Sequence, residues 1–143
     1  MTEFVLDERL ARRPVAADWG LSTVLFVDDA RFPWVIVVPR VPDVTEIHQL
    51  SAGDQAALIG EVARASRALK AAFHPEKINV AALGHHVPQL HVHVLGRNRS
   101  DPLWPDPVWG PGEREPHNPV PYGDPGFGEA LEKLRAALDR VMF

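Results

Sequence analysis

The chain has no cysteine, which excludes disulfide bonds, thiolate metal sites and a cysteine nucleophile. The absence fits a reducing compartment. No stretch approaches the roughly 20 apolar residues of a membrane span. The N-terminal sequence MTEFVLDERLARR has acidic residues near its start and no long apolar run, unlike a signal peptide. We therefore expect a cytoplasmic protein with no membrane partner.

Excess positive charge is absent as well. The 15 Lys and Arg residues are outnumbered by 19 Asp and Glu, the net charge is −4, and no basic run occurs. A nucleic-acid partner is therefore not expected, because binding to a phosphate backbone needs clustered cations. The 143 residues, 24% charged and 45% hydrophobic, have the composition of one soluble globular domain that is long enough to form a core.

Three apolar, β-branched runs indicate strands, at residues 21–27, 34–38 and 77–83. The first two are separated by a short polar connection, which favours an antiparallel hairpin. Because these strands cluster around one long helical segment, the predicted class is α+β with an antiparallel sheet of about five strands.

Apolar residues at helical spacing predict three helices. The longest starts after Ser51, a good N-cap residue, and ends at Phe73. A short helix is predicted over 4–13, where Pro14 would end it, and a C-terminal helix over 126–142. Between the sheet and the last helix, residues 98–126 are rich in proline and also contain tryptophan. We expect an ordered loop there, because disordered segments are poor in aromatic residues.

The segment from Gln89 to Val94 alternates polar and apolar residues, a period of two that is typical of a strand. One face then carries Gln89, His91 and His93. The opposite face receives Leu90, Val92 and Val94. The apolar face can enter a core and leave two imidazoles and an amide on a rigid element, which suits a site. The histidine pair alone is a weak indication, since chance supplies about 0.3 such pairs in a chain this rich in histidine, and the solvated face of an amphipathic strand explains it as well.

Two kinds of chemistry would use such a pair. Zinc needs three or four ligands, but Gln89 is a poor one and no carboxylate follows until Asp101, so we expect neither a metal site nor a cofactor. Alternatively, a neutral imidazole with a pKa near 6.5 can attack phosphorus. The second imidazole, if protonated, could then donate hydrogen bonds to the phosphoryl oxygens, and Gly84 would let the backbone approach a ligand closely.

The run from Val87 to Leu95, VPQLHVHVL, resembles the signature of the histidine triad (HIT) hydrolases and transferases, His-φ-His-φ-His-φ-φ with φ apolar. The order of the predicted elements also resembles that of the family, including a strand that ends in Pro39 followed by Arg40. The resemblance covers roughly residues 20–97 of a single HIT-like domain, 1–143. It implies about five antiparallel strands with two helices, in a homodimer with a continuous ten-stranded sheet.

The resemblance also implies substrates and residue roles. The substrates are nucleotides joined at the α-phosphate to another nucleotide, an amine or a sugar phosphate. The middle histidine, here His91, attacks the α-phosphorus, and water then hydrolyses the nucleotidyl-histidine. His93 is expected to contact the phosphate. Asp28 matches the family residue that holds the ribose hydroxyls, although a turn-forming aspartate in Asp28-Asp29 is an alternative.

Three features depart from the family pattern. Gln89 occupies the first histidine position, which in the family supports the nucleophile or its leaving group; glutamine can hydrogen-bond but cannot deliver a proton at neutral pH. The loop before the signature is reduced to Gly84-His85-His86, with His86 either a phosphate or proton donor or an exposed turn residue. A Trp-Pro-x-Pro-Val-Trp-Gly segment at 104–110 resembles that of a bacterial subgroup. It could line the leaving-group side or form a loop pinned by two buried indoles.

Two functions of different classes follow. The first is a nucleotidyl hydrolase or transferase that acts through His91 on a nucleoside phosphoramidate or dinucleoside polyphosphate. The second is a non-catalytic nucleotide-binding or partner-binding module that kept the fold without efficient turnover.

Overall fold

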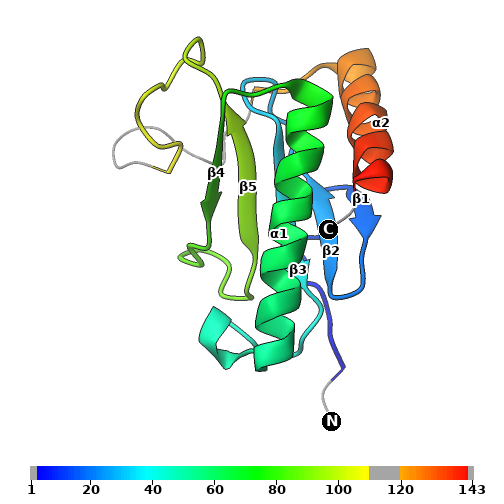
Figure 1. Ribbon diagram of the computed structural model, residues 1–143, viewed down its shortest axis with the longest axis vertical. Coiled ribbons are helices and arrows are strands. Elements are labelled where there is room, and N and C mark those ends of the chain that lie inside the picture. The colour runs from blue at the N-terminus through cyan, green and yellow to red at the C-terminus, as the bar shows by residue number, and fades with distance from the viewer. Residues whose placement is uncertain (1–2, 110–119, 142–143) are drawn as a thin grey trace.

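A computed structural model describes residues 3–109 and 120–141. It contains one five-stranded antiparallel sheet and two α-helices, which confirms the α+β class (Figure 1). In chain order the elements are β1 (Val15–Asp18), β2 (Ser22–Phe26), β3 (Trp34–Pro39), a 3₁₀ turn η1 (Ile47–Gln49), α1 (Ala52–Phe73), β4 (Lys77–Ala81), β5 (Val92–Arg97) and α2 (Asp124–Arg140).

The strands follow the order β1-β2-β3-β5-β4, and every neighbouring pair is antiparallel. The predicted hairpin of β2 and β3 is present, and β4 and β5 are also antiparallel neighbours. β4 is shorter than predicted, and β5 begins only at Val92 rather than at Gln89. The strand order places β5 inside the sheet, where it pairs with β3 on one side and with β4 on the other.

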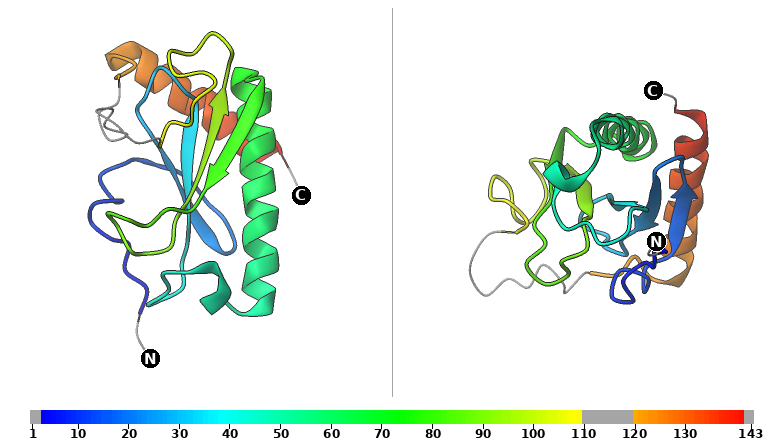
Figure 2. Two further views of the ribbon diagram at one scale, coloured as in Figure 1. Left: turned by 90° about the vertical axis from the view of Figure 1, so that its left-hand side faces the viewer. Right: turned by 90° about the horizontal axis from the view of Figure 1, so that it is seen from below.

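The two faces of the sheet are covered by different parts of the chain (Figure 2). On one face, side chains such as Val92 and Val94 pack against both helices in the larger core cluster. On the other face, Leu95 packs with Leu10 from the N-terminal segment and Val108 from the later loop. Because neighbouring residues of a strand point to opposite faces, His93 shares the second face with Leu95. Leu90, Val92 and Val94 therefore enter one core as predicted, whereas the face that carries His93 is a second apolar cluster rather than a polar face.

Helix α1 begins and ends as its sequence predicts. The Ser51 hydroxyl accepts a hydrogen bond from the backbone N–H of Asp54 at 3.1 Å, and His74 ends the helix with a φ of 55°. The apolar stripe is buried at Leu58, Val62, Ala65 and Leu69 and partly buried at Phe73, while Ile59 is 67% exposed. Helix α2 spans Asp124–Arg140, close to the predicted range. Among the described residues, no helix is long and apolar enough to span a membrane.

The helix predicted over 4–13 is wrong. The chain is irregular before a turn at residues 8–12, from which the side chain of Leu10 enters the core with 2% exposure. Pro14 is followed directly by β1, an edge strand that its alanine-rich sequence did not indicate. Hydrogen bonds to another part of the chain replace those of a helix, since the amide of Gln89 binds this segment. We call residues 3–13 the N-terminal segment.

The proline-rich loop is described over 98–109 and 120–123, while the predicted loop residues 110–119, including Gly110 of the tryptophan motif, lie outside the described residues. Its start is fixed by Arg97, which is 2% exposed and forms a bidentate ion pair with Asp101 at 2.7 and 3.0 Å. Trp104 and Trp109 are only partly buried. Trp109 packs against the second-face core, which places its ring beside His93 with 5.7 Å between centroids.

Candidate active site

A pocket of about 570 Å³ opens on the second face of the sheet. Its walls come from β3, the end of β2, the connection before β5, β5 itself, the N-terminal segment and Trp109. It collects six of the seven residues predicted for the site: Asp28, Gly84, His85, His86, His91 and His93. This volume lies within the 300–1,000 Å³ that is usual for small-molecule sites.

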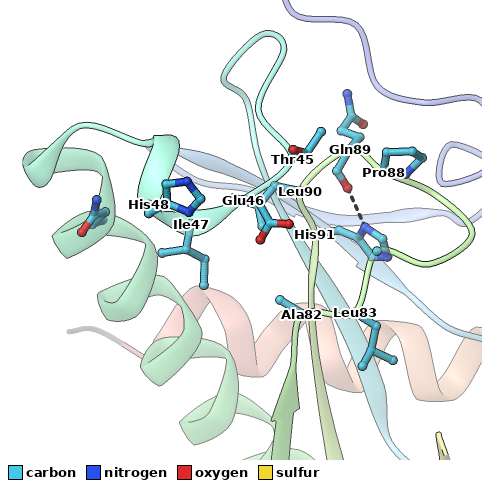
Figure 3. A pocket seen from close by; sticks show the side chains of 12 residues that line it. Thr45, Glu46, Ile47, His48, Ala82, Leu83, Pro88, Gln89, Leu90 and His91 are labelled. Carbon is cyan, nitrogen blue, oxygen red and sulfur yellow. Dashed lines mark hydrogen bonds between the residues drawn. The ribbon is translucent and has the colours of Figure 1, made fainter.

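His91 lies at the base of this pocket and is 7% exposed. Its Nδ1 lies 2.7 Å from the backbone carbonyl of Gln89 (Figure 3). A carbonyl oxygen can only accept, so Nδ1 carries the proton and donates. In the neutral ring Nε2 then holds a free lone pair, and no described residue forms a hydrogen bond with it. The main chain thus holds His91 as a nucleophile with Nε2 available for attack.

His93 is fixed in the opposite tautomer. The indole Nε1–H of Trp34 donates to Nδ1 of His93 at 3.0 Å. Because an indole N–H cannot accept, Nδ1 of His93 must be unprotonated, and the proton of the neutral ring resides on Nε2. The sequence expectation invoked a protonated second histidine; in this geometry protonation would set two N–H groups against each other. His93 can instead donate through Nε2 as a neutral imidazole.

The two imidazoles lie close enough to act on one group, with ring centroids 5.1 Å apart at 71°. One therefore offers a lone pair and the other an N–H donor within the same pocket. That combination suits attack on a phosphoryl group, where a nucleophile meets phosphorus while a donor stabilises the developing charge on oxygen.

We expect the acid limb of the kcat/KM profile to lie below pH 6.5. Burial is the main cause that lowers the pKa of His91 from its usual value near 6.5, and the charge of Arg13 lowers the pKa further, against the opposing effects of the Gln89 carbonyl and Asp7. A lowered pKa keeps the ring neutral, and therefore nucleophilic, to lower pH. A pH–rate profile for the free enzyme measures this; a limb at or above pH 6.5 would contradict it.

Replacing Trp34 with Phe is expected to lower kcat about tenfold, the cost of one hydrogen bond that holds a reacting group. His93 would lose the donor that sets its tautomer. Long-range ¹⁵N–¹H spectra of His93 would show a mixed tautomer or a protonated ring. Trp109→Phe is the matched control, since that indole also touches His93 but its Nε1 has no hydrogen-bond partner within residues 3–109 and 120–141. Unchanged ¹⁵N chemical shifts of His93 in Trp34→Phe would contradict the assignment of its tautomer to the Trp34 hydrogen bond.

The side chain of Gln89 is directed away from His91 (Figure 3). Its Oε1 accepts from the backbone N–H of Asp7 at 2.9 Å, and its Nε2 donates to the carbonyl of Val5 at 2.8 Å. One planar amide thus satisfies a donor and an acceptor of the N-terminal segment at once. Gln89 reaches His91 only through its own main-chain carbonyl.

The two adjacent aspartates have separate roles. Asp29, fully buried, accepts from the backbone N–H of Arg31 and forms an ion pair with the same residue, so it is the one that shapes the turn. Asp28 lines the pocket, and its Oδ1 accepts from the backbone N–H of Tyr122 at 3.0 Å. No hydrogen bond within the described residues uses Oδ2 of Asp28. That oxygen is therefore available to two hydroxyl donors of a ligand.

The connection before β5 supplies the remaining predicted residues. Gly84 has a φ of 71°, a conformation that glycine adopts without strain, and it lines both this pocket and a smaller one of about 380 Å³ beside Gln89 (Figure 3). His85 and His86 line the larger pocket but are exposed at its rim. The backbone carbonyl of His86 accepts from Arg9 at 2.8 Å, which ties this loop to the N-terminal segment.

Sequence reasoning missed part of the site. Trp34 was assigned only to a strand, and three arginines of the N-terminal segment that border the pocket, Arg9, Arg12 and Arg13, were assigned to a helix. The three arginines within residues 9–13 were the one signal in the sequence that could have indicated this wall. Within residues 3–109 and 120–141, no group of three or more His, Asp or Glu side chains is placed to hold a metal ion.

The pattern of the HIT domain matches residues 15–100, more than half of the chain. This chain belongs to the histidine triad family. Proteins of this family are in general nucleotide hydrolases and transferases, and nucleotide binding is their shared property.

Three solved structures of histidine triad proteins match almost the whole chain. The one from Marinobacter aquaeolei VT8 is 39% identical with a TM-score of 0.87 and covers 98% of this chain and 99% of its own. For Sinorhizobium meliloti 1021 the identity is 40%, the TM-score 0.81 and the coverage 97% of each chain. The protein from Bradyrhizobium japonicum is 39% identical with a TM-score of 0.84, and the match covers 99% of this chain and 100% of its own. No curated protein matches the chain.

Proposed function

We propose that this histidine triad protein is a nucleotidyl hydrolase or transferase that cleaves at the α-phosphate and forms a nucleotidyl-histidine on Nε2 of His91. The observation that carries the proposal is the Nδ1 hydrogen bond to the Gln89 carbonyl, which leaves Nε2 unprotonated in a pocket large enough for a nucleotide. Attack forms an N–P bond and breaks the bond from phosphorus to the leaving group. Water then breaks the N–P bond and releases the nucleoside monophosphate.

The other pocket residues have complementary roles in this proposal. The Nε2–H of His93 stabilises a phosphoryl oxygen as charge develops on it. The free oxygen of Asp28 accepts from the ribose hydroxyls. The connection at Gly84, His85 and His86 supplies main-chain and side-chain donors at the pocket rim. Gln89 positions the nucleophile through its carbonyl and the N-terminal segment through its amide.

The test is turnover of a panel of adenosine and guanosine phosphoramidates and dinucleoside polyphosphates, with intact-mass analysis of the protein during reaction. We expect release of a nucleoside monophosphate and a transient mass increase of one nucleotidyl group. Peptide mapping should place that group on His91. Binding of these nucleotides without turnover, and without any adduct, would contradict the proposal.

The second candidate is a nucleotide-binding module with little turnover. One observation favours it: the side chain in the first triad position is fully engaged with Val5 and Asp7, so it cannot assist a leaving group. In that case calorimetry would detect nucleotide binding that depends on Asp28, while the panel showed no release.

We also propose that the protein is a homodimer. β4 lies at an edge of the sheet, where its unpaired main-chain groups are open to another strand. Val80 on β4 is 49% exposed, and Ile59 on α1 is 67% exposed. Pairing of two β4 edges would join the two sheets. Sedimentation should give a dimer mass that Val80→Lys lowers toward a monomer, while Val120→Lys, on an equally exposed valine outside β4, should not change it.

A further inference from the structure

The wall of the pocket that the N-terminal segment forms is cationic. Arg9, Arg12 and Arg13 of the N-terminal segment face a single carboxylate, that of Asp28, in a chain whose net charge is −4. The charge of Arg9 is compensated by an ion pair with Asp7, in which Nη2 and Oδ2 are 2.9 Å apart. Within the described residues, neither Arg12 nor Arg13 forms an ion pair. Two uncompensated guanidinium groups therefore border the same pocket as His91.

Arg13 is a partly buried cation with no carboxylate partner among the described residues. It is partly buried, and burial is the main cause that lowers its pKa, with the charge of Arg12 adding to the effect. One hydrogen bond is assigned to it, from Nη1 to the carbonyl of Arg9 at 3.2 Å. The other N–H donors have no partner among the described residues. A partly desolvated cation without a carboxylate is unfavourable unless a ligand supplies the charge.

Arg13 and His91 line the same pocket, and the charge of Arg13 also contributes to the lowered pKa of His91. An anion bound by Arg13 would therefore lie close to the phosphorus that His91 attacks. Guanidinium groups bind phosphate oxygens in a bidentate manner, which makes phosphoryl groups the anion that fits best.

We propose that Arg12 and Arg13 form a subsite for the phosphoryl groups next to the α-phosphate, so that the preferred substrates carry a phosphoanhydride chain rather than an amine leaving group. The inference rests on the proposed function and names its substrate class: dinucleoside polyphosphates and nucleoside polyphosphates.

The chemistry of the first step agrees with this choice. Nε2 of His91 forms a bond to the α-phosphorus, the bond from phosphorus to the bridging oxygen breaks, and that oxygen keeps the electron pair. A phosphate leaving group is stable as an anion, and Arg12 and Arg13 neutralise its charge, so no proton donor is needed. An amine must gain a proton to leave, and the Gln89 amide cannot provide one. In the second step water forms the new P–O bond, the N–P bond breaks with its electron pair returning to Nε2 of His91, and the proton of the water goes to solvent.

Gln89 has a direct part in this subsite. Its side chain fixes the main chain of residues 5 and 7, and Arg9 fixes the same segment to the carbonyl of His86. These contacts hold the segment that carries Arg12 and Arg13 against the pocket. An amide that anchors the segment carrying the two arginines, in place of a histidine, is consistent with a leaving group that needs charge neutralisation and no proton.

Binding tests the subsite without turnover. Calorimetry compares AMP with α,β-methylene ATP, in which the reacting bridge is inert. Wild-type protein should bind the triphosphate analogue at least about tenfold more tightly, and Arg13→Ala should remove most of that difference while binding AMP with nearly unchanged affinity. Arg99→Ala is the matched control, since it removes an exposed arginine at the other end of β5. Equal affinity of wild type for the two ligands would overturn the proposal.

Turnover separates this inference from the proposed function. The ratio of kcat/KM for diadenosine tetraphosphate over an adenosine phosphoramidate should exceed one in wild type and fall about tenfold or more in Arg13→Ala. Arg13→Lys, which keeps the charge and loses the bidentate geometry, should give an intermediate ratio, and thermal melting shows whether each variant is folded. A wild-type preference for the phosphoramidate would refute the subsite and leave the proposed function intact. Absence of turnover and adduct with every substrate would refute the proposed function, while the binding comparison would still decide the subsite.

Discussion

Replacing His91 with Ala is expected to abolish nucleotidyl transfer, with kcat lowered by roughly 10⁴-fold or more, as is typical when a nucleophile is removed. The ring supplies a nucleophile that is held in the pocket by a tautomer-fixing hydrogen bond to a main-chain carbonyl. The nucleotidyl adduct should be absent from intact-mass spectra of the variant. Because the pocket walls remain, nucleotide binding should persist within a few-fold of wild type.

His93→Gln is the matched comparison for that experiment. It removes the neighbouring imidazole, 5.1 Å away between ring centroids, and keeps the nucleophile. A glutamine amide can still donate a hydrogen bond, so we expect a rate between those of wild type and His91→Ala, with the adduct still formed. If His91→Ala retained the adduct, or if only His93→Gln lost it, the roles of the two histidines would have to be exchanged.

The sheet and the long helices could be predicted because their periodicities are strong. Alternation from Leu90 to Val94 and the stripe along α1 each reflect burial on one face, which local sequence records directly. The N-terminal segment could not be predicted in this way. Its apolar residues have helical spacing, but the contacts that hold it come from Gln89, more than 80 positions away. Such long-range hydrogen bonds override local helix propensity.

The site residues that belong to a short sequence motif could be predicted, and those that are positioned by tertiary contacts could not. His91, His93 and Asp28 were placed by the motif and by strand order, and the structure brings all three into one pocket. Trp34 could not be found, because its contact with His93 depends on the register of β3 against β5, in which Trp34 pairs with Leu95 and lies diagonally across from His93. The tautomers of both histidines follow from such contacts and not from their spacing.

Replacing Gly96 with Ala is expected to destabilise the fold by about 3 kcal/mol, the upper end of the usual cost of overpacking. A Cβ at this position would lie 2.6 Å from Cβ of Pro75 and 2.7 Å from Cγ of Pro33. Neither proline can move aside easily, because both rings are part of the main chain and Pro33 is also bound to Gly96 by a 2.8 Å backbone hydrogen bond. Denaturant unfolding, read as a lowered midpoint with an unchanged slope, measures the loss.

The matched control is Gly128→Ala on the exposed side of α2, where a Cβ would meet nothing within 4 Å. That change should stabilise the protein by about 0.5 kcal/mol, because alanine favours a helix over glycine. The opposite signs of two chemically identical substitutions would show that close approach of the backbone, rather than glycine itself, is what β5 requires at Gly96. Since Gly96 follows His93 by three residues on β5, relief of the clash by a shift of the strand should also lengthen the Trp34–His93 hydrogen bond. Gly96→Ala is therefore expected to lower kcat in the protein that remains folded, whereas a loss of stability with no change in kcat would show that the strand absorbs the methyl group without moving the site.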